Sequence, residues 1–152
     1  MTLPAFLFIP FLAAAQTTGD VQFNGMILSS CTILVLTPGT LAVNTDGDLL
    51  SSENLGGLPG TATVTSTGLG YDLSITAPTG FDTAPTDGGT NTTYDASFSS
   101  IGVTIDPLVE VGDILSLGLG LSTLTVNASA QKSTGIFPAG TYQMTTTLTC
   151  SA

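Results

Sequence analysis

Apolar and polar residues alternate along most of the chain in short runs, which is the two-residue period of a β-strand. The first such run follows GDVQFNGMILSSC at residues 19–31, where Val21, Phe23, Gly25 and Ile27 fall on one side of an extended chain. Similar runs predict strands at residues 20–28, 32–36, 61–67, 71–76, 95–105, 115–128 and 142–150. After residue 15 no stretch holds the 3.6-residue period of a helix, so the pattern predicts no helix.

Turn-forming residues separate these runs. LTPGTL, NTDGD, LGGLPG and FPAGT are rich in Gly, Pro, Asn and Asp, and residues 77–92 form the longest predicted loop. Seven or eight strands without a helix predict one all-β domain of the sandwich or barrel class. A chain of 152 residues suits a single domain with a sizeable hydrophobic core.

The first fifteen residues, MTLPAFLFIPFLAAA, form an apolar run that ends in three alanines, as in a secretory signal peptide. Cleavage after Ala15 would leave Gln16 at the new N-terminus. A short membrane anchor is the alternative, although the run is shorter than the roughly 20 residues that span a bilayer and contains Pro4 and Pro10. We expect an exported chain whose mature part does not insert into the membrane.

The chain has two cysteines, and in an exported protein they indicate one disulfide. Cys31 shares parity with Val21 and Phe23, and Cys150 shares parity with Tyr142 and Leu148, so both lie on the apolar faces of their predicted strands. We therefore expect a Cys31–Cys150 bond between the first and last strands. A pair of buried free thiols is the alternative.

Charge is sparse and almost entirely negative. Eleven residues are Asp or Glu, Lys132 is the only basic residue, and the net charge is -10. Nucleic-acid binding requires clusters of Lys and Arg, so it is excluded. The chain contains no His, which removes the usual base of Ser and Cys hydrolases and the commonest zinc ligand. We expect no enzyme and no cofactor; a glycosidase that uses only carboxylates is the alternative.

A few side chains could still carry chemistry. Asp46 and Asp48, in NTDGD, could bind Ca²⁺ or act as acid and base, but Gly47 stands in the wrong place for a calcium loop, so we expect a solvated turn and no metal. A second group of acids is expected to lie in a loop: Asp106, Glu110 and Asp113.

The sequence around the one basic residue and around the tyrosines points less clearly to a function. Lys132 is expected to be a solvated loop lysine, with an isopeptide bond to a buried Asn or Asp as the alternative. Tyr71, Tyr94 and Tyr142 could stack on sugars, but the parity of Tyr71 and Tyr142 favours core or cross-strand packing.

The stretch GDVQFNGMILSSCTI resembles the N-terminal region of bacterial chaperone–usher pilins, and FPAGTYQMTTTLTCSA resembles the last strand of pilin-like and spore-coat-U-like secreted domains. The resemblance covers about 15 residues at each end. It implies an immunoglobulin-like β-sandwich at residues 29–152 that is incomplete, preceded by a donor-strand extension at residues 16–28. In that family the second Cys usually follows the first within a few tens of residues, whereas here it is Cys150.

In the family, the extension inserts into a groove of the neighbouring subunit and completes its sandwich. If the resemblance holds for this chain, Val21, Phe23 and Ile27 would fill pockets of that groove. Gly25 would lie where the groove is too shallow for a side chain. The implied function is a structural subunit of a surface filament, with copies of itself, a periplasmic chaperone and an outer-membrane usher as partners. A self-contained secreted binding or adhesive domain is the alternative, in which residues 20–28 pair within their own domain.

Overall fold

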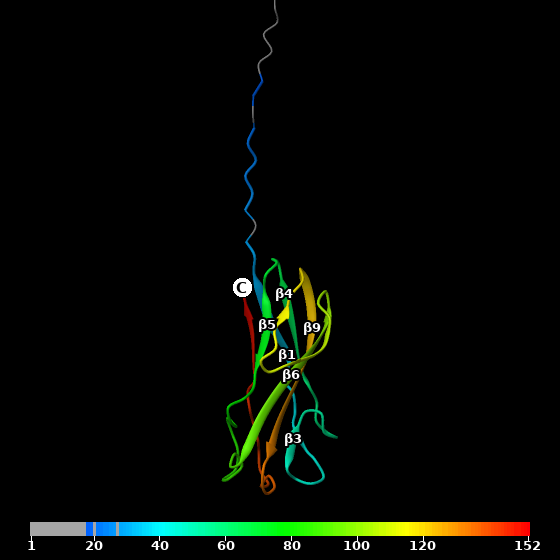
Figure 1. Ribbon diagram of the computed structural model, residues 1–152, viewed down its shortest axis with the longest axis vertical. Helices are drawn as coiled ribbons and strands as arrows, with labels where there is room; N and C mark the ends of the chain where they lie inside the picture. Colours follow the sequence, from blue (N-terminus) through cyan, green and yellow to red (C-terminus); the bar gives the residue numbers. More distant parts are fainter. Residues whose placement is uncertain (1–17, 20, 27) are drawn as a thin grey trace, which may run out of the picture.

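The computed structural model describes residues 18–19, 21–26 and 28–152, and these contain ten strands and no helix (Figure 1). The strands form two antiparallel sheets, as a β-sandwich requires. In chain order they are β1 (Cys31–Thr37), β2 (Ala42–Val43), β3 (Leu49–Ser51), β4 (Gly60–Ser66), β5 (Asp72–Thr76), β6 (Thr92–Gly102), β7 (Asp106–Glu110), β8 (Leu115–Ser116), β9 (Gly120–Lys132) and β10 (Thr147–Ser151).

The larger sheet is built around β9, its longest strand. One edge of β9 pairs with β6 over residues 122–132, and the other edge pairs with β4 and then with β3. Beyond these, β1 joins β4, β7 joins β6 and β2 joins β3, which gives seven strands. The smaller sheet has three strands in the order β10-β5-β8.

The core lies between the two sheets and follows the two-residue period of the strands. On β4, Ala62 and Val64 point inward and are buried. They pack with the largest buried apolar side chains of the core, which come from both sheets: Phe98, Leu73 and Leu124. The predicted all-β fold is therefore confirmed.

Hydroxyl groups lie on much of the outer face of the larger sheet, beside exposed apolar side chains such as Leu34. Thr61, Thr63 and Thr65 alternate with the core residues of β4, and Thr63 lies opposite Thr123 of β9. Their hydroxyls hydrate this face without charge, which explains how a chain with only 8% charged residues covers its sheet.

The two sheets differ in length. Strands β9 and β6 have 13 and 11 residues, whereas β5 and β10 have five each. Where the sheets overlap, Leu124 of β9 is fully buried. Farther along the same strand, Val126 and Ala128 also point inward, but they are only half-buried because the smaller sheet does not reach them. Part of the inner face of the larger sheet is therefore left without a covering strand.

The predicted disulfide between Cys31 and Cys150 is confirmed, and the alternative of two free thiols is wrong. The bond joins the first residue of β1 to β10, with 6.4 Å between the Cα atoms, and so links an edge of one sheet to an edge of the other. It indicates an oxidising, extracytoplasmic environment. Across the described part of the chain, no helix has the length and apolar character needed to cross a membrane.

The predicted strands at the two ends of the chain differ from the structure. The predicted strand at 20–28 is not formed, since residues 21–26 and 28 belong to no strand. Residues 20 and 27 and the predicted signal peptide at 1–15 lie outside the described residues. The predicted strand at 142–150 begins only at Thr147, because its partner β5 ends at Thr76 and Pro78 follows.

Three strands, β2, β3 and β7, were not predicted from the sequence. The loop expected at Asp106, Glu110 and Asp113 is wrong for the first two, which begin and end β7. That strand contains Pro107 and pairs only with β6, and an edge position is where a sheet tolerates proline. The other two strands, β2 and β3, are two and three residues long, too short for a periodic pattern.

We expect Phe98→Ala to lower the free energy of unfolding by about 3–5 kcal/mol, because it leaves a cavity between the sheets. Ile101→Ala is the matched control on the same strand, since Ile101 is 64% exposed and its loss should cost no more than about 0.5 kcal/mol. Urea unfolding of both variants measures the difference. Equal losses would contradict the assigned core.

Candidate functional site

The uncovered part of the inner face forms a groove of about 580 Å³. One wall is β1 and the loop after it, and the other wall is the segment that leads into β10. The floor consists of small and apolar residues from β4 and β9: Gly60, Ala62, Val126 and Ala128. The groove thus lies where the inner face of the larger sheet has no strand above it.

The walls of the groove combine apolar side chains with uncharged Thr and Gln, and they carry no charge. Ile33 and Val35 line one side, and Met144 and Leu148 line the other. Although Val35 points toward the interior, 68% of its surface is exposed, because nothing lies above it. Neither Cys31 nor Cys150 lines the groove, so the groove ends short of the disulfide. An uncharged apolar ligand with a strand-like shape fits such a site.

Both walls also offer backbone groups. Among the described residues, β1 pairs only with β4, and β10 pairs only with β5, so each has one edge without a strand partner. In residues 142–146 the single strand-like contact is the bridge between Gln143 and Thr83. Two unpaired edges that flank an apolar groove provide the hydrogen-bonding groups that an added strand needs.

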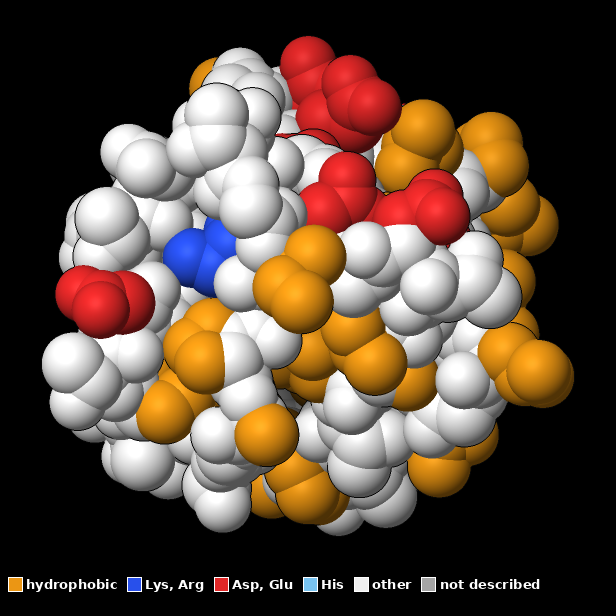
Figure 2. Space-filling view, turned by 90° about the horizontal axis from the view of Figure 1, so that it is seen from below, with side chains coloured by type: hydrophobic (Ala, Val, Ile, Leu, Met, Phe, Trp, Pro, Cys, Tyr) orange, Lys and Arg blue, Asp and Glu red, His pale blue; other side chains and the backbone are white. Residues whose placement is uncertain are grey.

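An aromatic cluster fixes the lower end of the second wall. Phe81 packs edge-on against Tyr94 at 5.1 Å and against Tyr142 at 5.0 Å between ring centroids, and Phe137 contacts Tyr142 at 5.5 Å. The Tyr142 hydroxyl donates a hydrogen bond to the Pro138 carbonyl at 2.6 Å. Figure 2 views this end and shows apolar side chains in its middle, with acidic side chains grouped beside them. The three predicted tyrosine candidates therefore pack within the fold, since Tyr71 also lies against the core.

Lys132 is buried, so the predicted solvated loop lysine is wrong. Its Nζ donates hydrogen bonds to the backbone carbonyls of Asp87 and Thr90, at 3.1 and 2.8 Å, and lies 5.1 Å from the centre of the Phe137 ring. Those partners are main-chain carbonyls, and no side-chain carboxyl or amide takes part as an isopeptide bond needs. The lysine ties the loop at 77–91 to β9 and thereby supports the aromatic cluster.

The N-terminal segment lies apart from the groove of its own chain. Its described residues extend away from the sandwich at the end where the C-terminus lies (Figure 1). Val21 is 74% exposed and Phe23 is 91% exposed, and no atom lies within 4 Å of the position that a Cβ on Gly25 would take. Ile27, the fourth predicted residue of this row, lies outside the described residues. The apolar row therefore has no partner on its own subunit at the described positions.

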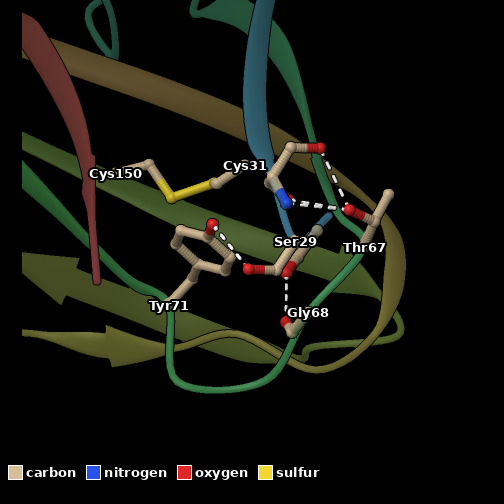
Figure 3. Close-up of a disulfide and its surroundings, with 8 residues drawn as sticks. Ser29, Cys31, Thr67, Gly68, Tyr71 and Cys150 are labelled. Atoms are coloured by element: carbon tan, nitrogen blue, oxygen red, sulfur yellow. Dashed lines mark hydrogen bonds between the residues drawn. A yellow bond between two sulfur atoms is a disulfide. The ribbon is translucent and has the colours of Figure 1, made fainter. Parts of the chain in front are cut away.

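The base of this segment is anchored beside the disulfide (Figure 3). The amide of Ser30 donates to Thr67 Oγ1 at 2.9 Å, and the amide of Thr67 donates to the Ser30 carbonyl at 2.9 Å. The hydroxyl of Tyr71 donates to Ser29 Oγ at 3.4 Å. These contacts fix where the segment leaves the domain.

Acidic residues of the two predicted groups form hydrogen bonds within turns. Asn44 Oδ1 accepts the amide of Asp48 at 3.1 Å, and Asn44 Nδ2 donates to Asp48 Oδ1 at 2.7 Å, which confirms the predicted turn at Asp46 and Asp48. In the other predicted group, Asp113 Oδ2 accepts the amide of Glu110 at 3.3 Å. Within residues 18–19, 21–26 and 28–152, no group of three or more acids and cysteines could hold a metal ion.

Comparison with protein-family models, with curated protein sequences and with solved structures finds no match to this chain. The function therefore has to be argued from the groove and from the unpaired segment.

Burial raises the pKa of Tyr94 and Tyr142 above the ordinary tyrosine value of 10.0. The folded chain thus holds these protons more tightly than the unfolded chain, so their contribution to stability is present below pH 10 and is lost as pH rises through the folded pKa. We expect the free energy of unfolding to fall with pH above about 10. Urea unfolding across that range should give a smaller slope for Tyr94→Phe and Tyr142→Phe. If both variants lost stability with pH as steeply as the unmodified protein, the pH dependence would not come from these two tyrosines.

Proposed function

We propose that this chain is an exported structural subunit of an extracellular filament, built on a pilin-like, immunoglobulin-like sandwich that a neighbouring copy completes. The observation that carries the proposal is the uncharged apolar groove between two unpaired strand edges in a chain whose own N-terminal apolar row is exposed. Each subunit thus has an exposed apolar segment that lies outside its own groove, and the segment of one subunit could fill the groove of the next. The proposal gives the chain no catalytic role.

The dimensions of the two parts agree. The second wall runs from Tyr142 to Leu148, seven residues, which is about 24 Å in extended form. Residues 21–28 span about 27 Å when extended. Burial of each large apolar side chain of the row would contribute about 1.5–3 kcal/mol, and backbone hydrogen bonds to both edges would fix the direction of the strand.

The positions of the two parts favour a fibre. The segment leaves the sandwich beside the disulfide, whereas the groove extends toward the opposite end, as far as Pro38 and Tyr142. A segment that leaves one end of a subunit and enters the other end of the next makes a head-to-tail contact. Such an interface does not close on itself, so it generates a filament.

An empty groove exposes apolar surface before assembly. Side chains such as Val35 would then favour aggregation, because unpaired edges and apolar patches attract other chains. The proposal therefore includes a periplasmic chaperone that covers the groove and an outer-membrane usher where subunits join. A self-contained secreted binding domain remains the other outcome of the test below.

We expect Phe23→Asp and Gly25→Leu to abolish long polymers while the domain stays folded. The first variant would bury an unpaired carboxylate, and the second would overfill the groove at a cost of about 1–3 kcal/mol, which is about 5- to 150-fold in joining affinity. The measurement is the ladder of polymers that survives unheated detergent gels, with circular dichroism as the check on folding.

Leu55→Asp is the matched control, because Leu55 is fully exposed and does not line the groove. It should leave the ladder unchanged. If Phe23→Asp polymerises like the control, the donor-strand proposal is wrong. If the unmodified protein forms no polymer, the self-contained domain takes its place.

A further inference from the structure

We infer that the Cys31–Cys150 disulfide is the end stop of the groove, and that it sets how far the strand of a neighbouring copy can insert. The inference rests on the proposed function. It assigns the disulfide a role in subunit register in addition to its role in stability.

The inference depends on the distance between β1 and β10 at the disulfide. A strand that pairs with β1 on one side and with β10 on the other would place those two strands about 9.6 Å apart, twice the spacing of neighbouring strands. The disulfide holds the Cα atoms of Cys31 and Cys150 at 6.4 Å. A third strand therefore cannot lie between them at this level, although the groove accepts one farther along.

The stop predicts a register. Both walls leave the disulfide toward the groove, so the first level with room is that of Ile33 and Leu148, which both line it. If the strand enters from the opposite end with its N-terminus leading, Val21 lies at this level and Phe23 lies near Val35.

The sequence before Val21 is consistent with this register. The preceding position on the same side of the strand is Gly19, which has no side chain to bury and would lie past the stop, outside the groove. The apolar row therefore begins at Val21, which is at the first level with room for it. Residues beyond it would remain outside the groove.

Peptide binding tests the stop. The acceptor is the full chain with Phe23→Asp, which keeps the groove and loses its own donor strand. The probes are a labelled peptide of residues 18–28 and the same peptide with Gly19→Val, measured by fluorescence anisotropy. We expect the two peptides to bind this acceptor equally. When the acceptor also carries Cys31→Ser and Cys150→Ser, the Gly19→Val peptide should bind about tenfold tighter than the first, as burial of one more valine would give.

The outcomes separate the two claims. If neither peptide binds, the proposed function fails and the stop with it. If both peptides bind but Gly19→Val gives the same gain with and without the disulfide, only the stop is overturned.

A second measurement covers the case in which the double serine variant does not fold. A photoreactive residue at position 21 of the peptide should label the walls around Ile33 and Leu148 in the disulfide-bonded acceptor, whereas the same group at position 18 should label neither wall. Labelling of the walls from position 18 would overturn the stop.

Discussion

The mismatch in length between the two sheets is the constraint on which the rest of the structure depends. A sandwich is stable when the inner faces of both sheets cover each other. Here β9 and β6 continue well past the end of β5 and β10, so Val126 and Ala128 point inward without a strand above them. The groove follows from this difference, and the unpaired edges of β1 and β10 flank it. The well-packed half, around Phe98 and Leu124, holds the chain together while the other half stays available.

The contacts around the groove support its walls in different ways. At one end the disulfide joins the two edges directly. At the other end the Tyr142 ring is held by Phe81 and Phe137, and Lys132 binds the loop behind them through two backbone carbonyls. The wall in between, residues 142–146, has few backbone partners of its own. This wall is therefore held in place at both ends. Between them, most of its backbone groups stay available to an added strand.

Local alternation was enough to predict the all-β class and most of the longer strands. The disulfide was predicted from the count of two cysteines in an exported chain, and parity supported it by placing Cys31 and Cys150 on apolar faces. Local alternation could not predict the groove. Residues 142–146 alternate as clearly as residues 147–151, and only the latter form a strand, because β5 ends at Thr76. That difference depends on a partner far away in the sequence. The burial of Lys132 was missed although a signal existed, since it shares parity with the inward-facing Leu124 and Ala130 of β9.

The charge of the chain limits how copies can join. Each subunit carries a net charge of -10, so copies repel one another over a distance of about 8 Å at physiological salt. Ion pairs cannot offset this repulsion, because the only basic side chain is buried against Phe137. The groove itself contains no charge. If copies join as proposed, the contact must therefore come from apolar burial and backbone hydrogen bonds, and the groove and the exposed N-terminal row offer both.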